Sequence, residues 1–412
     1  MASPRAALFT VMMVSFLATA GVALPFPMLA PYFLAGEGDP GLVAFLGVHP
    51  KLLLGASLAV YPLGILVGSS FLGVFSDHFG RKRVLVVTLC LGAVGYAATA
   101  WAVAAGSYPL FLLARFLTGV CEGNDAVARS IALDLHPHIS RSQAISLVFA
   151  ATYAGWLAGP LIGGYLMFLG MGTVFLLAGV ALLFCALVAR FTLPDNAAAQ
   201  AKVPVAALWR TAGTHNSLHL WREPPIRQML VFHLLYTLGL NACYEFYPVW
   251  LVEYFGSDPR EIAWLTVFMT AAMILNSAFV VTRLRARVGS VVLLNVATAC
   301  FAVMLGLLVL TPRPLVPLVF AVLGVLISLN NTSFPEYMIE RFTEEGSGRV
   351  MGLISTNFYV ANVGMAVFGS ILALAGSRWS LLAGSLLCAA AWLWLRRVTR
   401  QPVELSPGAK AS

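Results

Sequence analysis

Apolar blocks of about 20 residues recur along the whole chain, separated by short polar gaps. A helix of that length just crosses a hydrocarbon core of about 30 Å, and backbone polar groups in lipid must be bonded within their own segment. Charged residues make up only 10% of the chain and hydrophobic residues 60%, whereas soluble globular proteins carry roughly 25% charged residues. The pattern therefore predicts an all-α membrane protein and argues against a soluble fold.

The hydropathy pattern predicts 12 transmembrane helices, of which the plainest, 171–193 and 378–396, are expected to face lipid. The spans are expected near residues 8–34, 51–75, 84–105, 108–133, 143–169, 172–193, 227–253, 261–282, 290–311, 314–340, 349–376 and 378–395. The first 35 residues also resemble a signal peptide, with Arg5, an apolar stretch and then small residues. Because the apolar character continues to Leu34, we expect an uncleaved first span.

Basic residues indicate the orientation, because cytoplasmic loops of membrane proteins hold the excess of Lys and Arg. With the N-terminus inside, 19 of the 25 fall in cytoplasmic segments, four fall outside, and Arg115 and Arg129 lie within a span. We therefore expect both termini in the cytoplasm. The net charge of +8 lies in gaps between apolar blocks rather than on one face with aromatic residues, so nucleic acid is not an expected partner.

A long polar interval, 194–226, separates the sixth span from the seventh, and its residues 203–221 could form a short interfacial helix. We expect an N-terminal six-helix half at 1–193, a cytoplasmic linker at 194–226, a C-terminal six-helix half at 227–396 and a cytoplasmic tail at 397–412. Two such halves suggest a duplicated transporter with its site at the midplane between them.

Signals for metal, cofactor or catalytic chemistry are weak. The six cysteines all fall inside apolar blocks and none has CxxC spacing, so neither a zinc site nor a disulfide framework is indicated. His136 and His138 flank Pro137 in a polar loop without a nearby acid or cysteine. P-loop, zinc-protease and nucleophile-elbow motifs do not occur in the sequence. We expect no cofactor, no metal and no enzyme activity.

The loop between the second and third spans reads Gly73-Val-Phe-Ser-Asp77-His-Phe-Gly80-Arg81-Lys-Arg. Gly73 would let two helices approach closely, and Gly80 permits a turn conformation that strains other residues. Asp77 could bond to a helix N-terminus of the other half, where the helix dipole favours an anion, and so latch the cytoplasmic side shut. The alternative is a basic inside loop that merely carries an acid.

The second half repeats this loop in degenerate form at 282–289. It keeps Arg287 and Gly289, but Ala286 stands where the acid would be. We therefore expect the latch to be asymmetric between the two halves.

Two further motifs lie inside spans. The fourth span opens with Arg115-Phe-Leu-Thr-Gly119, and the fifth contains Gly155-Trp-Leu-Ala-Gly159-Pro160-Leu-Ile-Gly163-Gly164. Small residues four apart let two helix backbones pack closely, and a proline within a helix bends it.

Taken in order, these motifs resemble those of the major facilitator superfamily. The loop resembles the signature G-x-x-x-D-R-x-G-R-R/K, with His78 at the usual arginine, and Arg115 and Gly119 are similar to an R-x-x-x-G signature. The glycine-proline motif of the fifth span resembles the one associated with antiporters. Over nearly the whole chain the pattern is most similar to the twelve-span drug/proton antiporters of the tetracycline-exporter type, which implies export driven by proton entry.

The first span departs from that pattern. Tetracycline-type exporters carry an acid upstream of the proline matched here by Pro27, whereas this chain has Ala18 and Thr19 in that neighbourhood. Proton coupling must therefore use another group, or be absent.

The fourth span supplies candidates, because its four charged residues fall within an arc of about 80° on one helix. These residues are Arg115, Glu122, Asp125 and Arg129. An ionised side chain at the bilayer centre costs about 2.5–3.5 kcal/mol, so they must face a cavity or pair. One hypothesis is that the acids bind a cationic group or carry protons while an arginine holds an anionic group. The alternative is a structural ladder with Asp125 and Arg129 paired, and a gating role also competes for Arg115.

The second half has polar residues in corresponding spans, namely Asn241, Glu245, Asn331, Glu336 and Asn357. Glu245 is far from either end of its span and needs a partner or water. The asparagines could be ligands or interhelical contacts. Glu336 lies nearer the cytoplasmic end, where a gate or surface role competes.

These observations lead us to expect a monomeric, proton-coupled exporter in a bacterial inner membrane. Its expected partners are the lipid bilayer, protons and a small polar or zwitterionic organic molecule, such as a drug, metabolite or siderophore. Two alternatives remain open: a proton-driven importer of a metal chelate or other nutrient, and a lipid flippase or polytopic membrane enzyme.

Overall fold

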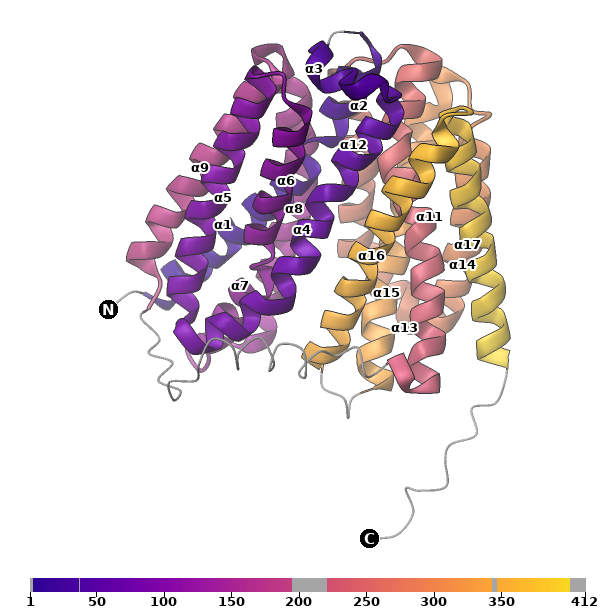
Figure 1. The fold of residues 1–412 in the computed structure, drawn as a ribbon. Helices are drawn as coiled ribbons and strands as arrows, with labels where there is room; N and C mark the ends of the chain where they lie inside the picture. Colours follow the sequence, from indigo (N-terminus) through magenta and orange to yellow (C-terminus); the bar gives the residue numbers. More distant parts are fainter. Residues whose placement is uncertain (1–2, 37, 195–220, 343–346, 401–412) are drawn as a thin grey trace.

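The computed structural model describes residues 3–36, 38–194, 221–342 and 347–400, which form a bundle of long helices (Figure 1). The first half contains α1 (Pro4–Ala23), α2 (Phe26–Leu34), α3 (Pro40–Val43), α4 (Pro50–Phe79), α5 (Arg81–Ala104), α6 (Tyr108–Glu122), α7 (Asp125–Asp134), α8 (Arg141–Leu166) and α9 (Met171–Thr192). The second contains α11 (Pro224–Phe255), α12 (Pro259–Asn276), η4 (Ser277–Val281), α13 (Thr282–Val288), α14 (Ser290–Leu308), α15 (Val316–Arg341), α16 (Ser347–Ala373) and α17 (Ser377–Arg400). The predicted linker helix and most of the predicted tail lie outside the described residues.

Within the described chain, 10 helical segments are long and apolar enough to cross a membrane. Helix α11 is longer still, at 32 residues, but carries polar residues along its middle. Helices α6 and α7 together make one more crossing, interrupted at Gly123 and Asn124. The predicted fold of 12 helices in two six-helix halves is therefore confirmed. We call the end of the bundle where α1 begins and α17 finishes the termini end, and the opposite end the α3 end (Figure 1).

Helix breaks occur where the sequence weakens the backbone ladder. Pro25 and Pro27 lack an N–H donor, and the first crossing divides there into α1 and α2. The fourth crossing breaks at Gly123, where an added Cβ would lie 2.5 Å from Ser69 N of α4. The Asn124 side chain then donates to Thr88 Oγ1 at 2.8 Å. Close packing against α4 and this hydrogen bond fix the position of the break.

The outer surface is apolar, as a lipid-facing bundle requires. Large exposed side chains cover α5, α9, α14 and α17, for example Val94, Phe184, Phe191, Val303 and Leu386. Helix α17 packs behind α11, where an added Cβ on Gly239 would lie 2.5 Å from the carbonyl oxygen of Gly384. The expected lipid-facing helices therefore also support the helices that line the centre.

The two halves meet along two long seams, α4 against α16 and α8 against α12, and α2 also contacts α11 and α12 of the other half. Near the α3 end, one glycine of the first half closes each seam. An added Cβ on Gly55 would lie 2.3 Å from the Ser370 Cβ. An added Cβ on Gly164 would lie 2.5 Å from both the Ala263 Cβ and the Pro259 carbonyl oxygen. The helices reach this separation because neither glycine carries a side chain.

Polar contacts reinforce the closure at the α3 end. In the first turn of α4, Lys51 Nζ donates to the Ala373 carbonyl oxygen at 2.6 Å, at the end of α16 where the helix dipole favours a cation. Lys51 also pairs with Glu253 of α11. On the other seam, Trp264 Nε1 donates to the Tyr165 hydroxyl at 2.5 Å. The α3 end is therefore closed.

The termini end is open between the halves. A cavity of about 960 Å³, which we call the vestibule, lies between α4, the start of α7 and α16. An added Cβ on Gly73 or Gly352 would meet no atom within 4 Å. The predicted close helix approach at Gly73 is therefore wrong for this conformation, because the halves are separated here.

Substitution of Gly164 by valine should open the α3 end, because the new side chain would force α8 away from α12. We expect spin labels on Phe168 and Leu310, exposed positions of opposite halves at that end, to move farther apart in a cysteine-free background. The matched control is Gly73→Val, which has space for the side chain and should leave the label distance unchanged. An unchanged distance in Gly164→Val would contradict the role of this seam.

Candidate functional site

The charged stripe predicted along the fourth span is divided by the break at Gly123. Arg115 and Glu122 belong to α6 and are buried within the first half. Asp125 and Arg129 belong to α7, form an ion pair at 2.7 Å and line the vestibule. The prediction of one continuous helix is wrong, because the glycine and asparagine at the break end the helical periodicity on which it depended.

Tyr61 of α4 joins the two buried charges of α6. The guanidinium carbon of Arg115 lies 4.0 Å from the centre of the Tyr61 ring and 5.3 Å from that of Phe175, which places the cation against two aromatic faces. The Tyr61 hydroxyl donates to Glu122 Oε2. Arg115 Nε and Nη1 and Glu122 Oε1 have no well-formed hydrogen bond among the described residues, although the Tyr96 hydroxyl lies beside the Arg115 guanidinium. Both charged groups therefore retain atoms that can bind another group.

A small pocket, which we call the central pocket, lies between the two halves. Arg115 and Tyr61 line it from the first half, and Asn241, Glu245 and Asn362 from the second. Glu245 is 2% exposed, and within the described chain neither of its carboxylate oxygens has a hydrogen-bond partner. Asn362 Nδ2 donates to Asn241 Oδ1 at 2.8 Å, which ties α16 to α11. The pocket thus presents a guanidinium from one half and a carboxyl group from the other.

Three stacked aromatic rings cross the interface beside this pocket. Phe26 of α2 stacks on Trp156 of α8 with centroids 6.1 Å apart, and Trp156 stacks on Tyr244 of α11 at 5.8 Å. All three also line a second pocket, whose wall includes Asn331. The stack therefore separates a charged compartment from a largely aromatic one.

Tyr359 of α16 separates the central pocket from the vestibule, since it lines both. A solute that enters from the termini end first meets the Asp125–Arg129 pair. It then has to pass Tyr359 to reach Arg115 and Glu245. Tyr359 is therefore the side chain positioned to act as an inner gate.

The structure places two of the predicted second-half residues outside these pockets. Glu336 pairs with Arg285 toward the termini end. Asn357 Nδ2 donates to the Leu230 carbonyl oxygen at 3.1 Å and lies 2.9 Å from His233 Nδ1. Both contacts hold helices together within the second half.

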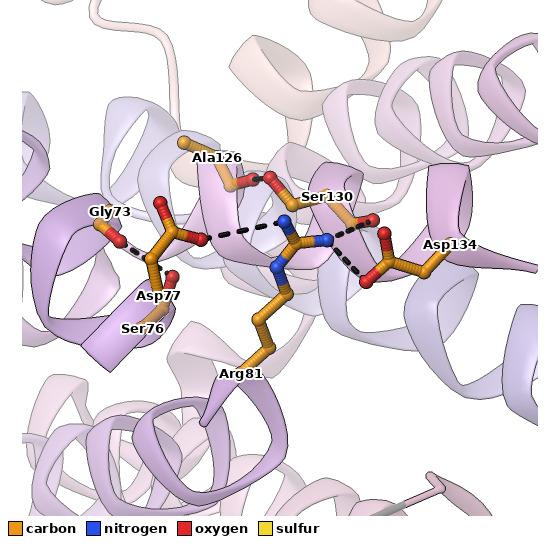
Figure 2. Close-up of polar contacts among 7 residues, drawn as sticks. All are labelled: Gly73, Ser76, Asp77, Arg81, Ala126, Ser130 and Asp134. Atoms are coloured by element: carbon orange, nitrogen blue, oxygen red, sulfur yellow. Dashed lines mark hydrogen bonds and ion pairs between the residues drawn. The ribbon is translucent and has the colours of Figure 1, made fainter. Parts of the chain in front are cut away.

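Figure 2 shows the polar network of the loop after α4. Gly80 has a positive φ of 95°, the turn conformation that favours glycine. Arg81 Nη1 donates to the Ser130 carbonyl oxygen at 3.0 Å and pairs with Asp134. Asp77 Oδ1 lies 3.4 Å from Arg81 Nη2, so in this conformation its described partner belongs to its own half. The predicted latch to the other half is not formed here, as the open termini end requires.

The second half has a comparable tie. Arg285 of α13 pairs with Glu336 of α15 and lies 3.8 Å from a Glu340 oxygen. In each half, then, an arginine near the loop binds the end of the fourth membrane crossing of that half, which is α7 in the first half and α15 in the second. The second half achieves this without an acid at Ala286.

The glycine-proline motif of α8 has two roles in packing. Added Cβ atoms on Gly155, Gly159 and Gly163 would lie 2.2–2.6 Å from carbonyl oxygens of α1 and the residue that follows it. Gly164 instead faces α12 of the other half, and Pro160 lines the second pocket. One short segment therefore packs α8 within its half and against the opposite half.

The sequence carries a family signal that agrees with this architecture. A sequence model of the Major Facilitator Superfamily matches residues 11–364. The chain belongs to the Major Facilitator Superfamily. It is thus a multi-pass membrane transporter of this superfamily.

Curated relatives within the superfamily include drug-resistance proteins. The tetracycline resistance protein of class E from Escherichia coli is 28% identical over 190 residues, which cover 45% of this chain and 44% of that protein. Multidrug resistance protein 2 of Bacillus subtilis is 24% identical over 213 residues, which cover 51% and 52%. The alignments therefore span about half the length of these relatives.

Solved structures share the fold over nearly the whole chain. The nucleoside transporter NupG has a TM-score of 0.72 at 12% identity and covers 96% of this chain and 100% of its own. The human organic anion transporter MFSD10 (TETRAN) has a TM-score of 0.68 at 18% identity, with 96% and 100% covered. At these identities the likeness extends to the fold alone.

Several residues of the pockets were not predicted from the sequence. Tyr61, Phe26 and Trp156 come from three different helices, and their positions follow only from how those helices pack. A polar aromatic residue beside Pro62, within the apolar run from Leu58 to Gly68, was the available signal for Tyr61.

Replacement of Tyr359 by alanine should join the vestibule to the central pocket. We expect a single cysteine introduced at Asn362 to react several-fold faster with a bulky water-soluble maleimide in nanodiscs, since the α3 end is closed. Tyr337→Ala, on a tyrosine outside the central pocket and the vestibule, serves as the control and should leave the rate unchanged. Equal rates with and without the Tyr359 ring would rule out its role as a gate.

Proposed function

We propose that this protein is a proton-coupled exporter of a small zwitterionic organic molecule. The observation that carries the proposal is the central pocket, in which buried Arg115 and Glu245 line one cavity from opposite halves with polar atoms left unpaired. Ionised groups in a membrane interior are costly unless they pair. A solute with one anionic and one cationic group would satisfy both at once.

In this proposal the two halves bind the two ends of the solute. The Arg115 guanidinium holds the anionic group with Nε and Nη1, a geometry suited to a planar carboxylate or similar anion. Glu245 holds the cationic group. Because the two residues belong to different halves, the bound solute links them and favours the movement that exposes the site on the other side.

We propose Glu122 as the proton-carrying acid. It is 5% exposed and lies outside the lining of the central pocket, behind Tyr61 and Arg115. Its contact with the pocket passes through the Tyr61 hydroxyl. A proton on Glu122 changes what that hydroxyl and the neighbouring guanidinium can bind, which would couple proton uptake to solute release. This assignment replaces the acid that is missing from the first span at Ala18 and Thr19.

Export as the direction is supported by the relatives, two of which are named for tetracycline and multidrug resistance. The predominance of basic residues in the loops of the termini end supports a cytoplasmic location for that end. We therefore propose a bacterial inner membrane, with the vestibule open to the cytoplasm. One chain encloses the pocket, so a monomer suffices.

Transport in inverted membrane vesicles tests the proposal, with tetracycline as the first zwitterionic probe. We expect accumulation when the vesicle lumen is acidic and its loss when a protonophore collapses the gradient. Accumulation that does not depend on the pH gradient would contradict proton coupling. Accumulation only in right-side-out vesicles would favour a proton-driven importer.

Neutralisation of Glu245 by Glu245→Gln should separate binding from coupling. We expect affinity for a zwitterionic probe to fall about tenfold or more, as expected for loss of a charge-assisted contact, while a singly charged anionic analogue binds as before. The matched control is Glu261→Gln, at the α3 end and outside the central pocket, because its partner Arg313 lies in the same half. Equal losses for both probes in Glu245→Gln would contradict the assignment of the cationic subsite.

Removal of one hydroxyl by Tyr61→Phe should uncouple protons from solute, because the ring under Arg115 remains while the link to Glu122 is lost. We expect solute binding to persist and its dependence on pH to flatten, as in Glu122→Gln. Tyr108→Phe removes another buried hydroxyl of the same half, which donates to the Leu53 carbonyl oxygen at 2.6 Å, and should leave the pH profile intact. Normal gradient-driven transport in Tyr61→Phe would refute the coupling route.

A further inference from the structure

A groove on the outer face of the second half lies far from the central pocket. It runs between α14 and α17 and is open to the outside of the bundle. Along α14 it extends from Val291 near the termini end to Cys300, which corresponds to about 14 Å of helix, roughly half of a 30 Å hydrocarbon core. Its walls are apolar, with Val292 and Val296 both more than half exposed. The groove therefore has the depth of one membrane leaflet.

The groove has a cation at its termini end. Arg396 of α17 lines it, and its guanidinium carbon lies 5.0 Å from the centre of the Trp392 ring. Within the described part of the chain, Arg396 has no acidic partner within 4.0 Å. Tryptophan and arginine at this depth are the residues expected at a membrane interface.

A second recess of about 580 Å³ continues from the groove toward the bundle. The two cavities share Val291 and Thr399, and the recess adds Gln228, Tyr337 and Arg341. Arg341 ends α15, so arginines of two helices flank the shared wall. The recess is thus a cationic, hydrogen-bonding compartment directly connected to an apolar one.

We propose that the groove and the recess together bind an anionic phospholipid. Arginine binds phosphate oxygens through paired N–H donors, and basic pockets between transmembrane helices suit anionic head groups. The phosphate lies between Arg396 and Arg341, and one acyl chain follows Val292 and Val296 along α14. An apolar groove alone would accept any acyl chain, and two arginines alone would bind any phosphate group. Their connection selects a molecule that has both parts.

The bound lipid would brace the helices behind the central pocket. The main-chain carbonyl oxygen of Gln228, a residue of the recess, accepts a hydrogen bond from Trp394 Nε1 at 2.9 Å. This bond ties α11 to α17. Helix α11 carries Asn241 and Glu245 farther along. The inference does not depend on the identity of the transported solute, because it concerns the outer face.

The test is native mass spectrometry of the full chain extracted from vesicles of phosphatidylglycerol mixed with phosphatidylcholine. We expect phosphatidylglycerol to be retained selectively, and the double variant Arg341→Ala with Arg396→Ala to retain it about tenfold less. The charge-matched control is Arg349→Ala with Arg397→Ala, on two exposed arginines of the same end outside both cavities. Equal losses in both double variants, or no loss in the first, would overturn the proposal.

The acyl half of the site needs its own variant. Val296→Trp fills the groove without a change of charge and should reduce retention, whereas Val303→Trp, on an exposed residue of α14 beyond the groove, should not. Full competition by glycerol phosphate would identify a phosphate site instead of a lipid site. Retention that survives Val296→Trp would likewise overturn the lipid assignment.

Discussion

The cost of an ionised side chain inside an apolar bundle governs the arrangement of this transporter. Arg115 cannot face lipid, so α6 turns it inward, where the rings of Tyr61 and Phe175 cover the guanidinium. Glu122 accepts a hydrogen bond from the Tyr61 hydroxyl. Glu245 lies on the opposite half and has no partner among the described residues. The lipid-facing helices and the packing between the two halves keep these three groups out of the hydrocarbon.

Glycine explains how two rigid halves can hold such a site and still separate. Gly55 and Gly164 bring helix backbones together across the seams at the α3 end, whereas Gly73 and Gly352 face empty space at the termini end. Contacts of this kind contribute through close packing rather than strong bonds, so they suit the opening and closing that the proposed transport function requires.

Sequence reasoning reached the fold and part of the site, for identifiable physical reasons. The length of the apolar spans and the scarcity of charged residues predict the transmembrane helices. The free-energy cost of placing Arg115, Glu122 or Glu245 in lipid indicates that these residues face the interior. The break after Glu122 could not be predicted, because helical periodicity assumes an unbroken helix. Asp125 follows the break and therefore lies in the vestibule rather than beside Glu122. Tyr61 could not be predicted as the link between Arg115 and Glu122, because that contact depends on the rotation of α4 relative to α6.

Lys51 has a partner that substitution cannot easily remove. Its ammonium binds the backbone carbonyl of Ala373, an atom that every amino acid supplies, although the Ala373 side chain is itself fully buried and therefore restricted by packing. The lysine has no such redundancy, since its charge and its reach across the seam are both needed. The hydrogen bond across this seam therefore depends on the identity of Lys51 but not on that of residue 373, where packing alone limits the side chain.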